Sequence, residues 1–278
     1  MREHAAHHVL SPGGLMKRCF FPLCLAIMIL GSGCALAAPD PASIPPKYGP
    51  AAAPCAVPLW QSPEYFQSAG HPAPDFWALI NYYTGQESGI YCSVAAVTMV
   101  LNAITRTSAD LRASDANYRQ PQLLDDVRTS HWKERVTGNG WEGRKGLTLA
   151  ELEDVVGDTI KTYGLQGWTV TRRFFTEATP AALAELRAIL EANEASSSDF
   201  VIAHFLQDKL TCDPGGPYPH ISPIGAYDAA SGRVLILDVD REYYSPYWVS
   251  VERLLIALCA RTPAFGHGGL IILRKLPR

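Results

Sequence analysis

Residues 84–104 read Thr-Gly-Gln-Glu-Ser-Gly-Ile-Tyr-Cys-Ser-Val-Ala-Ala-Val-Thr-Met-Val-Leu-Asn-Ala-Ile and contain the strongest structural signal in the chain. The polar, glycine-containing first part ends at Cys92, and an almost wholly apolar run follows from Val94 to Ile104. A run of this length favours a buried helix over a strand. We therefore expect Cys92 in the first turn of a core helix, where unpaired N–H groups and the helix dipole stabilise a thiolate.

A glutamine precedes this cysteine at a spacing that suits catalysis. Gln86 stands six residues before Cys92, so its side-chain amide could donate to an oxyanion together with the Cys92 backbone N–H. The alternative is that Cys92 is a small buried apolar residue, which is the usual role of a lone cysteine in a helix. A catalytic interpretation therefore requires a histidine elsewhere in the chain.

The second half of the chain contains a predicted β-hairpin. Two apolar runs, 220–227 and 233–238, flank a turn that includes a glycine. Folding the hairpin about Ala229 places Ile224 opposite Val234. The same predicted register pairs Ser222 with Ile236 further along the two strands.

In this register His220 lies opposite Asp238, close enough for the carboxylate to orient the imidazole. A slip of one residue would separate the pair, and Pro223 within the first strand indicates a bulge or an edge position. Each residue alone has a plain structural explanation. Together with Cys92 and Gln86, however, they predict a Cys-His-Asp catalytic site.

The N-terminus has the features of a secretory signal peptide, which we assign to residues 1–37. Lys17 and Arg18 precede an apolar run at 19–30, and Ala35-Leu36-Ala37 supplies a small-residue cleavage site. The apolar run is too short to span a membrane comfortably. We therefore expect export, most plausibly to a periplasm, and no membrane span.

Two features near this segment leave alternatives open. Cys34 suggests lipidation, but Gly31 stands where a leucine is usual, so a lipoprotein is less favoured. Met16 is an alternative start, because the preceding residues carry no signal features. Residues 38–54 are rich in Pro and Ala and are expected to form an extended, mobile leader, and 55–278 are expected to form the catalytic domain.

Composition excludes several functional classes. The 278 residues are 47% hydrophobic and have a formal net charge of −3, with no basic stripe, so we expect no nucleic-acid partner. No CxxC pair is present, so a structural zinc site is not expected. An exported chain permits one disulfide among Cys55, Cys212 and Cys259, and the sequence does not select the pair.

The order of the predicted elements indicates an α+β fold. A helix is expected from Asp75 to about Tyr83, and a capping box formed by Thr148 and Glu151 predicts another. Most strands are expected after residue 165, and sequential antiparallel strands following helices are typical of this class.

Four motifs together resemble the catalytic domain of phytochelatin synthases, over roughly residues 55–275. They are Gln86 with Tyr91-Cys92, Val100-Leu-Asn-Ala103, His220-Ile-Ser-Pro-Ile-Gly-Ala-Tyr227, and Leu235-Ile-Leu-Asp-Val-Asp-Arg-Glu-Tyr-Tyr-Ser-Pro-Tyr-Trp-Val249. The resemblance implies a papain-like fold in which a helical half, with the cysteine on its buried helix, packs against an antiparallel sheet half.

The resemblance also implies residue roles. Cys92, His220 and Asp238 would form the triad and Gln86 the oxyanion donor, while Arg241 and Tyr244 would lie near the substrate. The chain departs from the family at several positions. Ser93 follows the cysteine where glycine is usual, and Gly85 replaces a threonine of plant members. Gly266-His267-Gly268-Gly269 stands where an Arg-Gly pair is common, and we expect the protein to lack the Cys-rich C-terminal region of eukaryotic members.

By this resemblance the substrate is glutathione, and we expect a thiol-dependent peptidase that releases glycine from it. Transfer of the γ-glutamylcysteinyl group to a second glutathione is a further activity of the family. Short prokaryotic members behave mainly as peptidases, and an exported enzyme is poorly placed for cytosolic metal detoxification. The alternatives are an exported peptidase that processes Gly-Gly leaders and a non-catalytic exported binding module.

No cofactor and no metal site are expected in the protein. A heavy-metal ion would enter only as a thiolate complex of the substrate. The sequence does not fix the ratio of hydrolysis to transfer, and it leaves the oligomeric state open, with a homodimer as one alternative.

Overall fold

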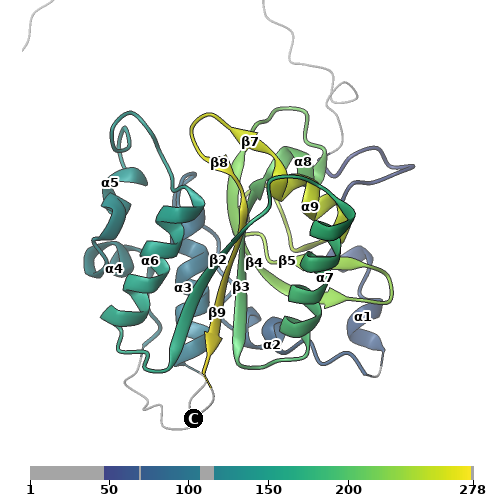
Figure 1. Cartoon of the computed structure of the whole chain (residues 1–278), viewed down its shortest axis with the longest axis horizontal. Coiled ribbons are helices and arrows are strands. Elements are labelled where there is room, and N and C mark those ends of the chain that lie inside the picture. The colour runs from purple at the N-terminus through teal and green to yellow at the C-terminus, as the bar shows by residue number, and fades with distance from the viewer. Residues whose placement is uncertain (1–46, 69, 107–115, 277–278) are drawn as a thin grey trace, which may run out of the picture. The chain divides into compact units, whose positions relative to one another are not determined.

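The computed structural model describes residues 47–68, 70–106 and 116–276 (Figure 1). The α-helices are α1 (Glu64–Gln67), α2 (Pro74–Ile80), α3 (Cys92–Thr105), α4 (Gln120–Asp126), α5 (Trp132–Arg135), α6 (Leu149–Thr162), α7 (Pro180–Glu194), α8 (Gln207–Thr211) and α9 (Val251–Cys259). The strands are β1 (Val57–Pro58), β2 (Trp168–Phe174), β3 (Asp199–Leu206), β4 (Pro219–Asp228), β5 (Arg233–Ile236), β6 (Tyr247–Ser250), β7 (Arg261–Thr262), β8 (Gly266–His267) and β9 (Gly269–Lys275). Short 3-10 helices cover Leu59–Gln61 and Thr129–His131. The predicted α+β class is confirmed.

The described strands form one large sheet and one small one. The large sheet has seven strands in the order β1-β6-β5-β4-β3-β9-β2, and every neighbouring pair is antiparallel. The strands β7 and β8 make a separate two-stranded sheet. All residues of β3 are buried, as expected for a strand inside a sheet that is covered on both faces.

A hydrophobic core lies on each face of the large sheet. Alternation along β3 divides its side chains: Phe200 and Ile202 join the core of α2, α3, α4 and α6, whereas Val201 and Ala203 join that of α7 and α9. Figure 1 shows α3, α4 and α6 on one side of β3 and β9, and α7 and α9 on the other. The sheet therefore separates the helix that carries Cys92 from the helices α7 and α9.

The helix α3 begins at Cys92, as predicted. Its residues from Ser93 to Ala103 are all buried, so the helix is surrounded by protein on every side. No side chain caps its N-terminus. The N–H groups of its first turn are therefore free to act on whatever lies beside Cys92.

Two other helix predictions had different outcomes. The capping box is confirmed: the Thr148 hydroxyl accepts from the Glu151 N–H, and the Glu151 carboxylate accepts from the Thr148 N–H. The prediction that Asp75 caps a helix reaching Tyr83 is wrong. The helix α2 starts at Pro74 and ends at Ile80, and the buried Asp75 instead accepts a hydrogen bond from Asn193.

The predicted hairpin exists as β4 and β5, but its predicted register is wrong. Ile224 pairs with Ile236 rather than Val234, and Asp228 pairs with Arg233. A bulge between Ile224 and Ala226 puts one extra residue into β4, which a symmetrical pairing cannot include. The strand β4 is also an interior strand, so the proline in it marks the neighbourhood of a bulge and not an edge.

One disulfide, between Cys55 and Cys212, links the chain near β1 to the end of α8, with the two Cα atoms 5.9 Å apart. Cys259 is a free thiol. Tyr48, from the region predicted to be a mobile leader, packs its ring against Tyr244 and Tyr247.

The predicted signal peptide and most of the leader lie outside the described residues. Within the ranges that the structure describes, no helix is long and apolar enough to cross a membrane.

Candidate active site

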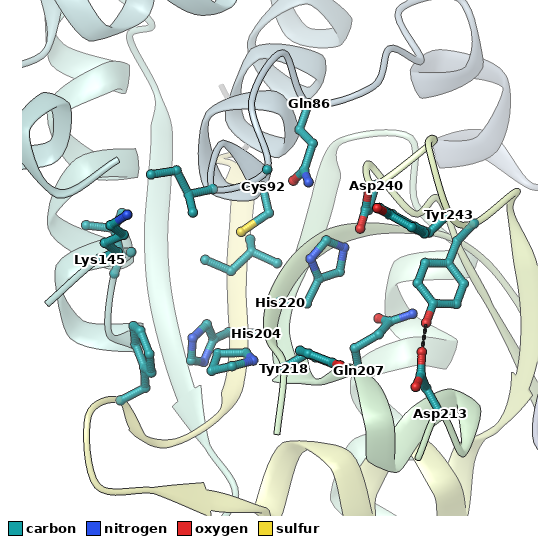
Figure 2. A pocket seen from close by; sticks show the side chains of 18 residues that line it. Gln86, Cys92, Lys145, His204, Gln207, Asp213, Tyr218, His220, Asp240 and Tyr243 are labelled. Atoms are coloured by element: carbon teal, nitrogen blue, oxygen red, sulfur yellow. Dashed lines mark hydrogen bonds between the residues drawn. The ribbon is translucent and has the colours of Figure 1, made fainter. Parts of the chain in front are cut away.

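A cavity of about 550 Å³ lies where the N-terminus of α3 meets β4. Cavities of this size hold small-molecule substrates. Figure 2 shows Cys92 and His220 near its centre, with Gln86 above them and Gln207 below. Four of the predicted site residues, Gln86, Cys92, His220 and Tyr244, therefore line one cavity, although they come from distant parts of the chain.

The thiol of Cys92 lies at the start of α3 and faces the cavity. The next residue, Ser93, is buried and accepts a hydrogen bond of 2.9 Å from the Trp132 indole N–H. The serine that replaces the usual glycine is therefore accommodated by a core hydrogen bond. Its side chain is engaged away from the reacting atoms.

His220 is held by Asp238 despite the altered hairpin register. The His220 Nε2 atom lies 2.9 Å from Asp238 Oδ1 and 3.1 Å from the Ser222 hydroxyl. Cys92 and His220 both line the cavity, and the Cys92 side chain interacts with the imidazole in the sense that raises the pKa of His220. Since Asp238 occupies Nε2, Nδ1 is the nitrogen that remains for the thiol. The thiol, the imidazole and the carboxylate therefore follow one another in the order that a catalytic triad requires.

Asp238 is fully buried and surrounded by donors. Its Oδ1 atom accepts from the Asp240 N–H at 2.8 Å, and Oδ2 accepts from the Tyr247 hydroxyl at 2.9 Å and from Gln207 Nε2 at 3.2 Å. Burial raises the pKa of this carboxyl, but His220 and the hydrogen bonds outweigh burial and bring the pKa below its usual value. Asp238 is therefore an anion in the folded protein.

The buried anion changes the protonation of its neighbour. Burial lowers the pKa of His220, yet the charge and hydrogen bond of Asp238, with a smaller contribution from Cys92, raise it well above its ordinary value. A second buried histidine, His204, behaves in the opposite way. Burial, together with repulsion from His220, lowers the pKa of His204 to about 4. His204 is thus neutral and His220 can hold a charge.

The loop before α3 fixes Gln86. The Gln86 N–H donates to the Val239 carbonyl at 2.8 Å. The side chain of Gln120 spans the same loop, because its Nε2 donates to the Gly85 carbonyl and its Oε1 accepts from the Glu87 N–H. The amide of Gln86 faces Cys92 and His220 (Figure 2), where an oxyanion donor is needed.

The two predicted substrate-binding residues differ in their location. Tyr244 is buried, lines the cavity, and donates a hydrogen bond to Asp213 at 2.9 Å, which is the dashed line in Figure 2. Arg241 is exposed and lies outside the cavity lining, with its guanidinium 4.6 Å from the centre of the Tyr83 ring. The structure thus brings Tyr244, and not Arg241, to the cavity.

The glycine-rich segment before β9 has a steric explanation. A Cβ atom on Gly268 would lie 2.1 Å from the His204 carbonyl oxygen, and one on Gly269 would lie 2.2 Å from the Arg173 carbonyl oxygen. A basic side chain therefore has no room at either position. Among the residues that the structure describes, no cluster of three or more His, Cys, Asp or Glu side chains could hold a metal ion.

Sequence reasoning missed several residues of the site. Gln207 and Tyr247 complete the environment of Asp238, Gln120 holds the Gln86 loop, and Lys145 and His204 line the cavity. Only Tyr247 carried a signal, since it lies in the last of the four motifs. Polar residues that are distant in sequence gave no pattern from which their convergence could be inferred.

A cysteine at the head of a buried helix, facing a His–Asp pair on an antiparallel sheet, defines a papain-like thiol site. The family model described as phytochelatin synthase matches residues 59–266. The chain therefore belongs to the phytochelatin synthase family.

Similarity to individual relatives agrees with this assignment. The chain is 27% identical over 204 residues to glutathione gamma-glutamylcysteinyltransferase 3 of Lotus japonicus, which covers 73% of this chain and 38% of the relative. It is 25% identical over 202 residues to glutathione gamma-glutamylcysteinyltransferase 1 of Triticum aestivum, which covers 72% of this chain and 36% of the relative. The chain thus spans well under half the length of these curated relatives.

Proposed function

We propose that this protein is a thiol enzyme that cleaves glutathione and releases glycine, with Cys92 as the nucleophile. The main support is that Cys92 and His220 line one cavity and that the buried Asp238 lies 2.9 Å from the His220 ring. The relatives suggest the substrate class, since both are glutathione gamma-glutamylcysteinyltransferases.

In the first step the Cys92 proton passes to His220, and the sulfur attacks the carbonyl carbon of the Cys–Gly peptide bond of glutathione. The carbonyl oxygen becomes an oxyanion, which accepts hydrogen bonds from the Gln86 amide and the Cys92 N–H. The buried Asp238 stabilises the charged imidazole while this intermediate exists.

The intermediate then collapses. His220 returns the proton to the glycine nitrogen, the C–N bond breaks, and a γ-glutamylcysteinyl thioester remains on Cys92. His220, now neutral, takes a proton from the incoming acceptor, which attacks the thioester. Water yields γ-glutamylcysteine. An acceptor glutathione instead attacks through the free α-amino group of its glutamyl residue, which forms the new peptide bond. The amino group of its cysteinyl residue cannot attack, because it is already acylated.

We propose that water is the main acceptor. The side of the cavity beyond His220 carries the carboxylates of Asp213 and Asp240 (Figure 2). An acceptor glutathione would bring two carboxylates to this side, where the leaving glycine of the donor brings one, and would be repelled more strongly, whereas water would not be repelled. Tyr244 borders the same region and is proposed to contact the substrate. Arg241 would reach it only after leaving the Tyr83 ring.

No resident metal or cofactor takes part in these steps. A heavy-metal ion would enter as a thiolate complex of glutathione, that is, as substrate. Export is also part of the proposal. The Cys55–Cys212 disulfide supports it, because such bonds persist mainly in oxidising compartments.

The test is to incubate the protein with glutathione and to quantify free glycine. We expect release by the wild type and a loss of at least about 10⁴-fold in the Cys92→Ala variant. The free thiol Cys259 offers a matched control, since Cys259→Ala removes a sulfur outside the cavity lining and should retain activity. Undiminished release by Cys92→Ala, or preferential cleavage of a Gly-Gly leader peptide, would contradict the proposal.

A further inference from the structure

The cavity has two chemically different ends, on either side of Cys92. We call the side beyond His220, with Asp213, Asp240 and the neighbouring tyrosines, the acidic end. The opposite side, which we call the Lys145 end, is lined by Lys145, Gly146, Leu147, His204 and Phe265. Figure 2 shows Lys145 and Asp240 on opposite sides of Cys92.

The position of His220 determines which part of a substrate occupies each end. The leaving nitrogen must come within hydrogen-bonding distance of the imidazole that protonates it. The leaving group therefore lies towards His220 and the acidic end. The acyl part, which stays bound to Cys92 as the thioester, extends in the other direction and reaches the Lys145 end.

Lys145 is the one Lys or Arg residue among the described residues that line the cavity. Its ammonium group makes no hydrogen bond or ion pair with any described residue. The guanidinium groups of the nearby Arg135 and Arg144 are both held by Glu151, in ion pairs of 2.9 Å and 2.6 Å. The ammonium group of Lys145 can therefore pair with a ligand directly, whereas the two guanidinium groups are already paired with a carboxylate.

The backbone around Lys145 is well anchored. The Gly146 N–H donates to the Arg135 carbonyl at 2.9 Å, and Trp141 and Arg144 form a β-bridge just before Lys145. The ring of Phe265 packs against Gly146, because a Cβ atom there would lie 3.3 Å from it. The ammonium group is therefore carried on a fixed backbone at the rim of the cavity.

The remaining surface of this end contains no competing anion. Leu147 is buried and apolar, and His204 is neutral because burial lowers its pKa to about 4. A carboxylate bound here would meet one cation and no opposing charge. Lys145 itself is exposed at the rim, so the strength of such a charge-assisted pair depends on the solvent that the bound substrate displaces.

We propose that Lys145 binds a carboxylate carried by the acyl part of the substrate. This inference rests on the proposed function, under which that group is the α-carboxylate of the γ-glutamyl residue of glutathione. Lys145 is then a specificity-determining residue that selects γ-glutamyl substrates and sets the direction in which they bind.

The test compares two substrates in several variants. One is glutathione, and the other is 4-aminobutyryl-cysteinyl-glycine, which lacks only the α-carboxylate. In the wild type, loss of the carboxylate should lower kcat/KM about 10- to 100-fold. In Lys145→Ala and Lys145→Gln, glutathione should lose a similar factor, and the two substrates should become nearly equivalent. Lys145→Arg should restore part of the preference.

The exposed Lys161, near the end of α6, provides the control. Lys161→Ala removes the same charge outside the cavity lining and should leave the substrate preference unchanged. A thermal melt compares the folding of all variants. If Lys145→Ala keeps the full wild-type preference for glutathione, or if the wild type shows no preference, the inference is overturned.

A binding experiment separates this inference from the proposed function. Glutathione and the analogue are titrated into Cys92→Ser and into the double variant Cys92→Ser/Lys145→Ala by calorimetry. If the wild type releases no glycine, the proposed function fails, but carboxylate-dependent binding that disappears with Lys145 still supports the inference. Equal affinities for glutathione and the analogue in both variants would contradict the inference.

Discussion

The half of the site on α3 and the half on β4 and the loop after β5 are held in place by different interactions. Cys92 is positioned by a helix buried from Ser93 to Ala103, so that packing around the backbone fixes the sulfur. His220 is positioned by a buried carboxylate that accepts hydrogen bonds from Tyr247 and Gln207.

This difference indicates how each half should respond to change. Apolar packing depends little on pH, whereas a network around a buried anion changes with the protonation of its members. Substitutions on the helix side should therefore alter stability at every pH. Substitutions on the sheet side should alter both the rate and its pH dependence.

The largest expected effect comes from Asp238→Asn. Loss of the anion should lower glycine release by roughly 10³- to 10⁴-fold, as expected when a catalytic histidine loses its orienting carboxylate. In the wild type, Asp238 raises the pKa of His220 well above 6.5, so the proton needed by the leaving glycine is lost only at high pH. In the variant this alkaline limit of kcat/KM should move to lower pH.

A pH–rate profile of both proteins measures this shift, with residual activity of the variant quantified at high enzyme concentration. An unchanged alkaline limit in Asp238→Asn would mean that the carboxylate does not control the imidazole.

The next largest effect is expected for Gln86→Ala. Removing one oxyanion donor should lower kcat by about 10²- to 10³-fold while the alkaline limit stays in place, because Gln86 carries no proton in the reaction. Gln120→Ala tests the same position indirectly, since it releases the loop without deleting the donor. An equal or greater loss in Gln120→Ala would show that loop position, and not the donor, dominates.

A smaller effect is expected on the free energy of unfolding, whose pH dependence should differ between Tyr247→Phe and Trp132→Phe. Tyr247 donates to Asp238, and its loss should reduce the free energy of unfolding by about 1.5–3 kcal/mol at neutral pH. The pKa of Asp238 is lowered in the folded protein, so its contribution is present above the unfolded-state pKa and disappears as pH falls through the folded-state pKa. The difference in free energy of unfolding between Tyr247→Phe and wild type should therefore shrink as pH falls through the folded-state pKa of Asp238.

Trp132→Phe provides the comparison on the helix side. It leaves the buried Ser93 hydroxyl without its donor and should cost about 1–3 kcal/mol at any pH. Urea unfolding at several pH values measures both variants. A pH-independent loss in Tyr247→Phe would remove the distinction between the two halves.

The smallest effect is expected for Asp240→Asn. With one negative charge removed from the acidic end, the ratio of transfer products to free γ-glutamylcysteine should rise roughly two- to fivefold. Chromatography of the products at low and high glutathione concentration measures this ratio. A ratio that does not change would exclude repulsion at Asp240 as the reason for preferring water.

The sequence was sufficient for the parts of the structure that local patterns determine. The apolar run after Cys92 predicted α3, and Thr148 with Glu151 predicted the start of α6, because both signals lie within one turn or one face of a helix. The pairing of His220 with Asp238 was also predicted, although through an incorrect register.

The remaining features depend on tertiary structure. The bulge beside Gly225 arises where β4 changes partners, and a Cβ atom on this glycine would lie 2.9 Å from the Leu237 side chain. The donors around Asp238 come from β6 and α8, and Lys145 reaches the cavity from a loop with no motif. Such convergence has no signature in a single sequence.

The central claim is that Cys92, His220 and Asp238 act as one proton-transfer unit on glutathione. Rapid quenching followed by intact-protein and peptide mass spectrometry tests it most directly. The wild type should carry one γ-glutamylcysteinyl group on Cys92, formed together with free glycine, and His220→Ala should carry none on the same timescale. An adduct on another residue, or undiminished acylation of Cys92 in His220→Ala, would contradict the claim.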